Sequence, residues 1–293
     1  MKKLFFLAAT VCTIFSCSKP EEPIIEQLSK LPINISIDQI TRANDEAFMV
    51  GDKVGIYVVN YTGATTPGTL AASGNHANNV QFELGNSSWS PASPIYWLDK
   101  TTKADFYAYY PYSSTSVNTS AHSFSVMADQ STEANYWASD FLWGKTTSAP
   151  TATVGITTNH VFSNVLIYLQ AGDGFTAETL AATTPSVKIN NVKTSATINL
   201  ATGVATATGD AATITSWNVG EYYRAMIIPQ TIANDTSLIT VTINGVDYTL
   251  KSGATFVANQ QHTVTVKVNK SSNGVNIGIG GWGTGTEYGG DAE

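Results

Sequence analysis

The sequence predicts an all-β protein, and three observations support this prediction. Apolar side chains alternate with polar ones in several short segments, which is the spacing of antiparallel strands with one buried face. Residues that favour turns separate these segments. Helical spacing is scarce, and only residues 174–182 could form a short helix. Many short strands with few helices favour a sandwich or a barrel.

The alternation and the turns define the order of the expected strands. Alternation is clearest at residues 33–37, 54–58, 106–110, 239–243, 247–250 and 264–268. Turn candidates lie at residues 60–63, 74–75, 190–191, 201–203 and 244–245. Asn244-Gly245 is the strongest of them, because both residues tolerate positive φ and two-residue hairpin turns require it.

The first residues resemble the signal of a bacterial lipoprotein. Lys2 and Lys3 precede an apolar stretch, residues 4–14, which is too short to span a bilayer. Ser16 then precedes Cys17, as in a lipobox, where the thiol is acylated and the chain is cut before it. We therefore expect residues 1–16 to be a signal peptide and Cys17 to carry lipid. A plain secretory signal or an apolar strand is the alternative.

The length and composition suggest how the rest of the chain is organised. Residues 18–23 are polar and contain prolines, so we expect residues 17–30 to be a tether. The remaining length suggests two domains, which we place at residues 31–155 and 156–293, with a boundary in the Pro- and Thr-rich stretch of residues 146–158. No run after residue 17 is long enough for a transmembrane helix.

The charge and the cysteines exclude several classes of partner and bond. Removal of residues 1–16 takes away two lysines, so the formal charge falls from −7 to −9. Such a charge argues against nucleic acid or an anionic membrane surface as a partner. Cys12 lies in the expected signal and Cys17 would be acylated, so the mature fold has no disulfide.

No motif for catalysis, metal or cofactor binding stands out. The four histidines, at positions 76, 122, 160 and 262, lack the spacing of metal ligands. Lys145-Thr146 resembles the end of a P-loop, but Ser139 stands where that motif needs glycine. The glycines of residues 278–283 follow no βαβ pattern. We therefore expect no cofactor and no enzymatic activity, and we interpret His160 as a structural histidine.

Aromatic residues cluster at residues 96–97 and 106–112. Exposed rings at these positions would form a platform on which a sugar could stack. The alternation of the second segment instead places about half of its rings inside a sheet, where they pack as core. We favour the core interpretation.

Several segments, in order, resemble the fimbrillin family of Bacteroidetes, the FimA- and Mfa-like subunits of type V pili. The resemblance extends from about residue 30 to 283 and includes the lipobox. The segments are Thr41-Arg42-Ala43, Phe48-Met49-Val50-Gly51-Asp52-Lys53-Val54-Gly55-Ile56-Tyr57, Pro94-Ile95-Tyr96-Trp97, Asp105-Phe106-Tyr107-Ala108-Tyr109-Tyr110-Pro111, His160-Val161-Phe162-Ser163-Asn164-Val165 and Ile228-Pro229-Gln230-Thr231.

The resemblance implies a fold and a mechanism of assembly. It implies two β-sandwich domains of transthyretin-like topology and transport to the cell surface as a lipoprotein anchored in the outer membrane. A trypsin-like protease would cut between Arg42 and Ala43 and release the first strand. A strand from the carboxyl end of another subunit would then fill the groove, which is a form of β-strand addition.

The residues supply candidates for both strands of this exchange. The displaced strand would carry Ile33, Ile35 and Ile37, and burial of each is worth roughly 1.5–3 kcal/mol. A donor strand with the same alternation is found near the carboxyl end. Its candidate residues are Val275, Ile277, Ile279 and Trp282. Two alternatives stay open: residues 275–282 are the last strand of their own domain, and Arg42 is an ordinary solvated arginine.

Two functions follow from the sequence. The first is a fimbrial subunit that joins other pilus subunits by strand exchange and contributes to adhesion, as stalk, tip or anchor. The second is a surface lipoprotein that never polymerises and binds glycan through its Tyr/Trp cluster. The absence of catalytic motifs places an enzyme third.

Overall fold

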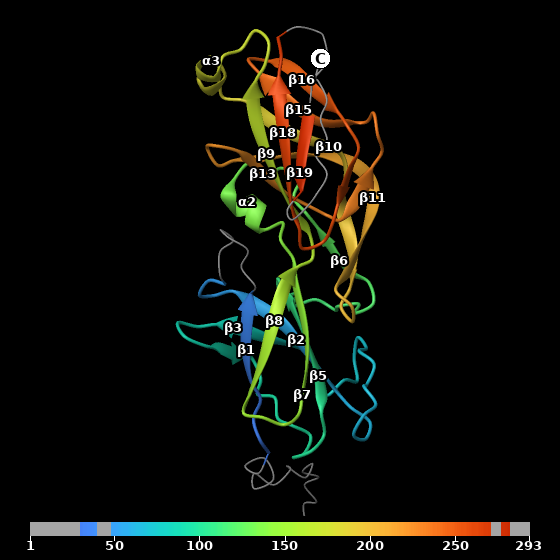
Figure 1. Cartoon of the computed structure of the whole chain (residues 1–293). Coiled ribbons are helices and arrows are strands. Elements are labelled where there is room, and N and C mark those ends of the chain that lie inside the picture. The colour runs from blue at the N-terminus through green and yellow to red at the C-terminus, as the bar shows by residue number, and fades with distance from the viewer. Residues whose placement is uncertain (1–29, 40–47, 271–276, 282–293) are drawn as a thin grey trace, which may run out of the picture. The chain divides into compact units, whose positions relative to one another are not determined.

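The computed structural model describes residues 30–39, 48–270 and 277–281, with the backbone alone at Gln39 and at residues 277–281. The described residues from Leu31 onward belong to one compact unit. Within the described ranges, no helix has both the length and the apolar character that a membrane span needs. Strands dominate (Figure 1), which confirms the predicted all-β class.

Three main sheets account for most of the strands. The first has the order β1 (Asn34–Gln39), β8 (Thr153–His160), β7 (Leu142–Ser148), β5 (Ala104–Tyr110), β2 (Lys53–Asn60), β3 (Ala77–Leu84), β4 (Trp89–Pro91). The second has the order β11 (Val204–Thr215), β10 (Ser186–Asn199), β15 (Ser237–Ile243), β16 (Val246–Lys251), and β6 (His122–Ser125) also pairs with β10. The third has the order β12 (Trp217–Asn218), β13 (Tyr223–Ile227), β9 (Ser163–Ala171), β18 (Gln261–Val268), β19 (Ile277–Gly281).

The remaining elements are short. A two-stranded sheet joins β14 (Gln230–Ile232) to β17 (Ala254–Phe256). Helix α3 (Ala177–Ala181) lies within the only stretch for which the sequence predicts a helix. Helix α2 (Glu133–Trp137) has no apolar periodicity long enough to predict it. It begins because the Thr132 hydroxyl accepts a hydrogen bond from the Asn135 N–H, as an N-cap does.

Strands β2 and β5 are buried on both faces, although their alternation predicts one buried face. They lie in the middle of the first sheet, and each face packs against a different hydrophobic cluster. Ile56 and Phe106 belong to the cluster that also holds the isoleucines of β1. Tyr57 and Tyr107 face a second cluster, which continues into the other two sheets. Tyrosine alternates like a polar residue in sequence but buries its ring here.

Two strand pairs are parallel, which corrects the expectation of purely antiparallel sheets. Strand β1 pairs with β8, and β18 pairs with β9, both in parallel. Strand β8 ends at His160 and β9 begins at Ser163, so one nearly continuous stretch serves first the first sheet and then the third (Figure 1). The boundary that we expect after residue 155 falls inside β8, and the division into two domains stays a prediction.

The turn signals differ in outcome. Asn244 and Gly245 have φ angles of 51° and 80° and connect β15 to β16, which confirms the predicted hairpin. Asn190-Asn191 is wrong as a turn, because β10 continues through both residues. Asn191 has a φ of 59° and the pairing of β10 with β11 shifts there, so the pair forms a β-bulge. Asparagine suits both structures because it tolerates positive φ.

Candidate functional site

Strand β1 forms one edge of the first sheet and fills a hydrophobic slot. The alternation begins at Ile33, directly before the strand, and places Ile33, Ile35 and Ile37 inside, at 3%, 4% and 6% exposure. Between them, Asn34 is exposed and Ser36 is half-buried, and Asp38 after Ile37 is exposed. The isoleucines pack in the cluster that includes Val54, Ile56, Val58, Phe82, Trp97, Phe106, Val154 and Ile156. Their burial contributes roughly 5–9 kcal/mol in total, so loss of β1 would leave an apolar groove.

The amino end of β1 is bonded on two sides. On one side, the Ile33 N–H donates to the Ile95 carbonyl over 2.9 Å and the Trp97 N–H donates to the Leu31 carbonyl over 3.0 Å. On the other side, β1 runs in parallel register with β8 from Asn34 opposite Thr153 to Gln39 opposite Thr158. The strand is therefore fixed at its start by two neighbours and along its length by β8.

A narrow recess lies where β8 gives way to β9. Its volume is about 20 Å³, room for about one water. Apolar side chains and side-chain amides both line it. The residues that line it are His160, Phe162, Asn164, Met226, Asn259, Gln260 and Gln261. The recess lies two residues past Thr158, the last partner of β1 on β8.

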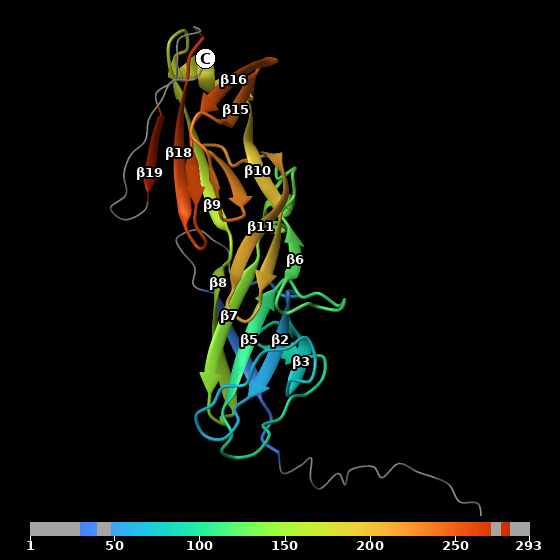
Figure 2. The ribbon, with the colours of Figure 1, turned by 90° about the vertical axis from the view of Figure 1, so that its right-hand side faces the viewer.

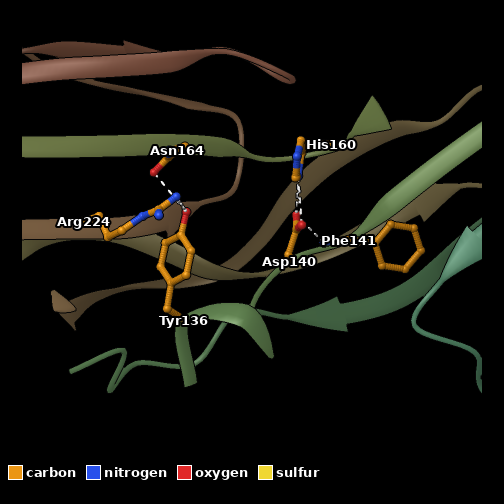
Figure 3. Close-up of polar contacts among 6 residues, drawn as sticks. All are labelled: Tyr136, Asp140, Phe141, His160, Asn164 and Arg224. Carbon is orange, nitrogen blue, oxygen red and sulfur yellow. Dashed lines mark hydrogen bonds and ion pairs between the residues drawn. The ribbon is translucent and has the colours of Figure 1, made fainter. Parts of the chain in front are cut away.

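Hydrogen bonds hold the side chains around this recess in place (Figure 3). Asp140 lies 2.8 Å from Nδ1 of His160 and also accepts from the Phe141 N–H over 2.8 Å. Asn164 accepts from the Tyr136 hydroxyl over 3.1 Å and donates to Oε1 of Gln261 over 3.0 Å. The contact with Asp140 supports the interpretation of His160 as structural. No local pattern in the sequence predicts Asp140 as its partner.

Arg224, one of only two arginines in the chain, lies beside this network and is 6% exposed. Its guanidinium carbon is 4.2 Å from the centre of the Tyr136 ring, and Trp137 and Trp217 also lie within reach of its charge. Nη2 donates to the Tyr136 hydroxyl over 2.5 Å. The arginine thus ties helix α2 to the face of β13. Nothing in the local sequence predicts this role.

The carboxyl-terminal candidate strand pairs within its own chain. Ile277–Gly281 form β19, which runs antiparallel to β18 and lies at the edge of the third sheet (Figure 2). Ile277 pairs with Val266 and Ile279 with Val264. In this structure, residues 277–281 therefore form the last strand of their own chain's sheet, which is the alternative to a donor strand. Val275 and Trp282 lie outside the described residues, as do Cys17, Arg42 and Ala43.

Most of the aromatic cluster belongs to the core. The rings of Trp97, Tyr107 and Tyr109 are buried, as the favoured interpretation of the sequence predicts. Burial raises the pKa of the Tyr109 hydroxyl and raises that of Tyr57 to about 12. The cluster therefore does not form the exposed platform that glycan binding through it would need.

The described residues carry no group suited to hold a metal. Across residues 30–39, 48–270 and 277–281, no three His, Cys, Asp or Glu side chains gather as a metal site would require. The site that the geometry defines is instead structural. It is a sheet whose edge strand occupies an apolar slot, with a narrow recess past the end of that strand.

Comparisons with known proteins agree with this class of structure. A profile described as fimbrillin-like matches residues 41–282. The chain is 26% identical over 301 residues to a Bacteroides uniformis protein that carries the name fimbrium subunit Fim1C, with 96% of each chain covered. A Bacteroides ovatus protein named as a fimbrium tip subunit is 34% identical over 84 residues, which cover 27% of this chain and 14% of that protein.

Two crystal structures of proteins described as cell adhesion proteins share the fold. One, from Bacteroides uniformis, has a TM-score of 0.64 at 22% identity and covers 87% of this chain and 99% of its own. The other, from Bacteroides ovatus, has a TM-score of 0.64 at 15% identity and covers 90% of this chain and 97% of its own. At these identities the likeness shows the β-sandwich-like fold alone.

The chain belongs to the fimbrillin-like family, since the profile matches most of its length. This confirms the family that the sequence motifs resemble. The family consists of fimbrial structural and adhesion subunits and not of enzymes. Membership therefore supports a fimbrial or adhesive role for this chain.

Proposed function

We propose that the chain is a structural subunit of a cell-surface fimbria, a type V pilus, that assembles by proteolysis-triggered donor-strand exchange and contributes to adhesion. The observation that carries the proposal is the position of β1. It is an edge strand, its three isoleucines are 3–6% exposed, and it ends three residues before Arg42. A cut there would separate the strand from the sheet that it completes.

Delivery to the surface uses the lipid on Cys17. Several acyl chains on one cysteine give stable membrane attachment, so the subunit would wait in the outer membrane before it is processed. The names of the relatives support a place on the cell surface, because one is a fimbrium subunit and another a fimbrium tip subunit. The partners are then other pilus subunits, and a host or glycan receptor is a further candidate.

The choice of Arg42 as the cleavage site is supported by elimination. The chain has two arginines, and Arg224 is buried in β13 with its guanidinium over Tyr136. A protease needs an accessible segment, so Arg224 is protected in the folded protein. Cleavage would give a new amino end at Ala43.

From Phe48 onward, the chain has contacts of its own in addition to those with the cluster that holds the isoleucines. The Phe48 ring packs against Trp89 at 5.1 Å and against Tyr110 at 5.6 Å between ring centres. The Met49 N–H donates to Asp52 over 2.7 Å. Cleavage and removal of β1 would therefore leave the start of β2 in place, and the groove would keep its other wall.

The donor strand would come from residues 275–282 of a second subunit. Val275, Ile277 and Ile279 repeat the alternation of Ile33, Ile35 and Ile37, so they match the slot that β1 vacates. To reach it, the strand must first leave β18, on which β19 lies at the edge of its own sheet. Trp282 would follow the last of these side chains.

Intact mass and amino-terminal sequencing of the protein from the surface of its host test the proposal. A chain that starts at Ala43 without lipid supports processing and strand exchange. A chain that still starts at acylated Cys17, in a strain that displays fimbriae containing it, contradicts them.

A variant pair sharpens the test. Arg42→Ala should abolish the heat-resistant ladders of subunits, because no acceptor groove opens. Arg42→Lys is the control. It keeps the charge and a bond that trypsin can cut, so ladders should form after treatment with trypsin. Ladders formed by Arg42→Ala would show that assembly does not depend on this cut.

A further inference from the structure

We propose that the recess between β8 and β9 receives Gly283 of the donor strand from a second copy and thereby sets the register of insertion. This inference rests on the proposed strand exchange and names the contact that fixes its geometry. It commits to one occupant, the carboxyl-terminal segment 281–283 of another subunit.

The recess continues the line of β1. Strand β1 pairs with β8 as far as Gln39 opposite Thr158. Farther along, the Phe162 carbonyl accepts from the Asn259 N–H over 3.0 Å, where the chain enters β18. The stretch between Thr158 and Phe162 thus lies past the end of β1 and before the start of β18. The recess opens there, with His160 and Asn259 among its walls.

The donor sequence fits this line in one register. If Val275, Ile277 and Ile279 replace Ile33, Ile35 and Ile37, then Gly281 replaces Gln39. The next residue on the same face is Gly283, which the parallel register with β8 places opposite His160. Trp282 falls on the opposite face and does not enter the recess, because side chains alternate along a strand.

The size of the recess favours glycine. A volume of about 20 Å³ leaves little room at this point, so a residue without a side chain is accommodated there with less displacement of the lining residues than a larger one. The carboxamide groups of Asn259 and Gln261 that line it both donate and accept hydrogen bonds, as a peptide group does. Val275, Ile277 and Ile279 therefore match the positions of the three isoleucines. Gly281 and Gly283 match the narrow recess that follows those positions.

The experiment uses the full chain, cut after Arg42 by an arginine-specific protease, as the acceptor. Synthetic peptides of residues 274–286 with a fluorescent label are the donors, and binding is measured by anisotropy. Gly283→Leu should weaken binding by about tenfold or more, since overpacking a confined site is costly. Gly285→Leu is the matched control, because it adds the same side chain beyond the recess, and its affinity should stay within about twofold.

A widened recess provides a second test. Asn259 has a φ of 57°, so Asn259→Gly removes its side chain without strain in the backbone. This acceptor variant should recover binding of a Gly283→Ala peptide. Thermal melting of the uncut variant checks that it folds.

The outcomes separate this inference from the proposed function. Ile279→Asp should abolish binding if strands exchange at all. If Ile279→Asp abolishes binding while Gly283→Leu binds like the wild-type peptide, the recess has no role and strand exchange stands. If the wild-type peptide does not bind the cut chain, strand exchange through this segment fails, and the inference fails with it.

Discussion

Strands β1 and β19 are both edge strands, yet they are held in different ways. Strand β1 buries three isoleucines and is bonded to two neighbours at its amino end. Strand β19 pairs with β18 alone, and three of its five residues are glycine. Glycine has no side chain to bury and loses more conformational freedom than other residues when it is ordered. The free energy needed to detach the strand from its sheet therefore differs between β1 and β19.

This difference suits a subunit that exchanges strands. The first strand should stay bound until a cut releases it, because its loss leaves an apolar groove. The last strand should leave its own sheet at low cost, because it has to reach another subunit. The stabilities of four sets of variants therefore test whether β1 is held more tightly than β19.

The largest effect is expected at the centre of β1. Ile35→Ala should lower the free energy of unfolding of the uncut chain by about 2–5 kcal/mol, because it leaves a cavity in a closely packed cluster. Ser36→Ala, next to it on the outward face, should change that free energy by no more than about 0.5 kcal/mol. Urea denaturation measures both. Equal shifts in the two variants would show that β1 does not fill its slot tightly.

Removal of β19 should have a smaller effect. A chain that ends at Lys270 should stay folded and lose less than about 2 kcal/mol, since an edge strand rich in glycine contributes a few main-chain hydrogen bonds, each of modest net value. Thermal melting compared with Ile35→Ala tests the ranking. A truncated chain less stable than Ile35→Ala would reverse the comparison.

A single polar contact at the start of β1 should contribute less again. Nδ2 of Asn34 donates to the Ala152 carbonyl over 2.9 Å at an exposed position. Asn34→Ala should therefore cost about 0.5–1.5 kcal/mol. Asn34→Asp removes the donor but keeps the shape, so a similar loss in both variants would assign the effect to the hydrogen bond. If neither variant lowers the free energy of unfolding, burial of the isoleucines is the main interaction that keeps β1 in its sheet.

Acid should weaken the end of the molecule where β19 lies. Burial lowers the pKa of His262, whose ring lies beside Phe256 and whose Nε2 accepts from the Val257 N–H over 3.1 Å. The unfolded chain, with a pKa of about 6.5, then binds more protons than the folded one, so stability is complete above about pH 6.5 and falls as pH decreases below it. His262 pairs with Gly281 of β19, which links this loss to the carboxyl-terminal edge.

The variant His262→Gln isolates this contribution. Burial also lowers the pKa of His122, so the wild-type slope contains both histidines. Urea midpoints between pH 7.5 and about 5 should fall less steeply in the variant than in the wild type. Parallel curves would show that His262 does not titrate differently in the folded and unfolded chains.

Local pattern predicts much of the fold. The alternation at Ile33, Ile35 and Ile37 predicts a strand with one buried face, and the structure places those side chains inside. Asn244-Gly245 predicts a hairpin turn, because only a few residues accept positive φ in succession. The isolated position of His160 in sequence, without metal-ligand spacing, predicts a structural role. Each of these depends on residues close together in the chain.

The site depends on contacts that are distant in sequence. Strand β1 lies beside β8 more than a hundred residues later, in parallel, and no local pattern specifies that partner. Arg224 meets Tyr136 across 88 residues and is buried, a contact that no local pattern specifies. The recess forms from β8, β9, β13 and the turn before β18, four segments that only the folded sheets bring together.

The class of fold, most strand candidates and the family can be predicted from periodicity, turn residues and motifs, which act over a few residues. Strand pairing, the burial of individual tyrosines and the end of the slot that β1 fills depend on contacts between distant segments. Alternation identifies the apolar face of a strand. It does not identify the surface that covers this face, because that surface is formed by segments distant in the chain.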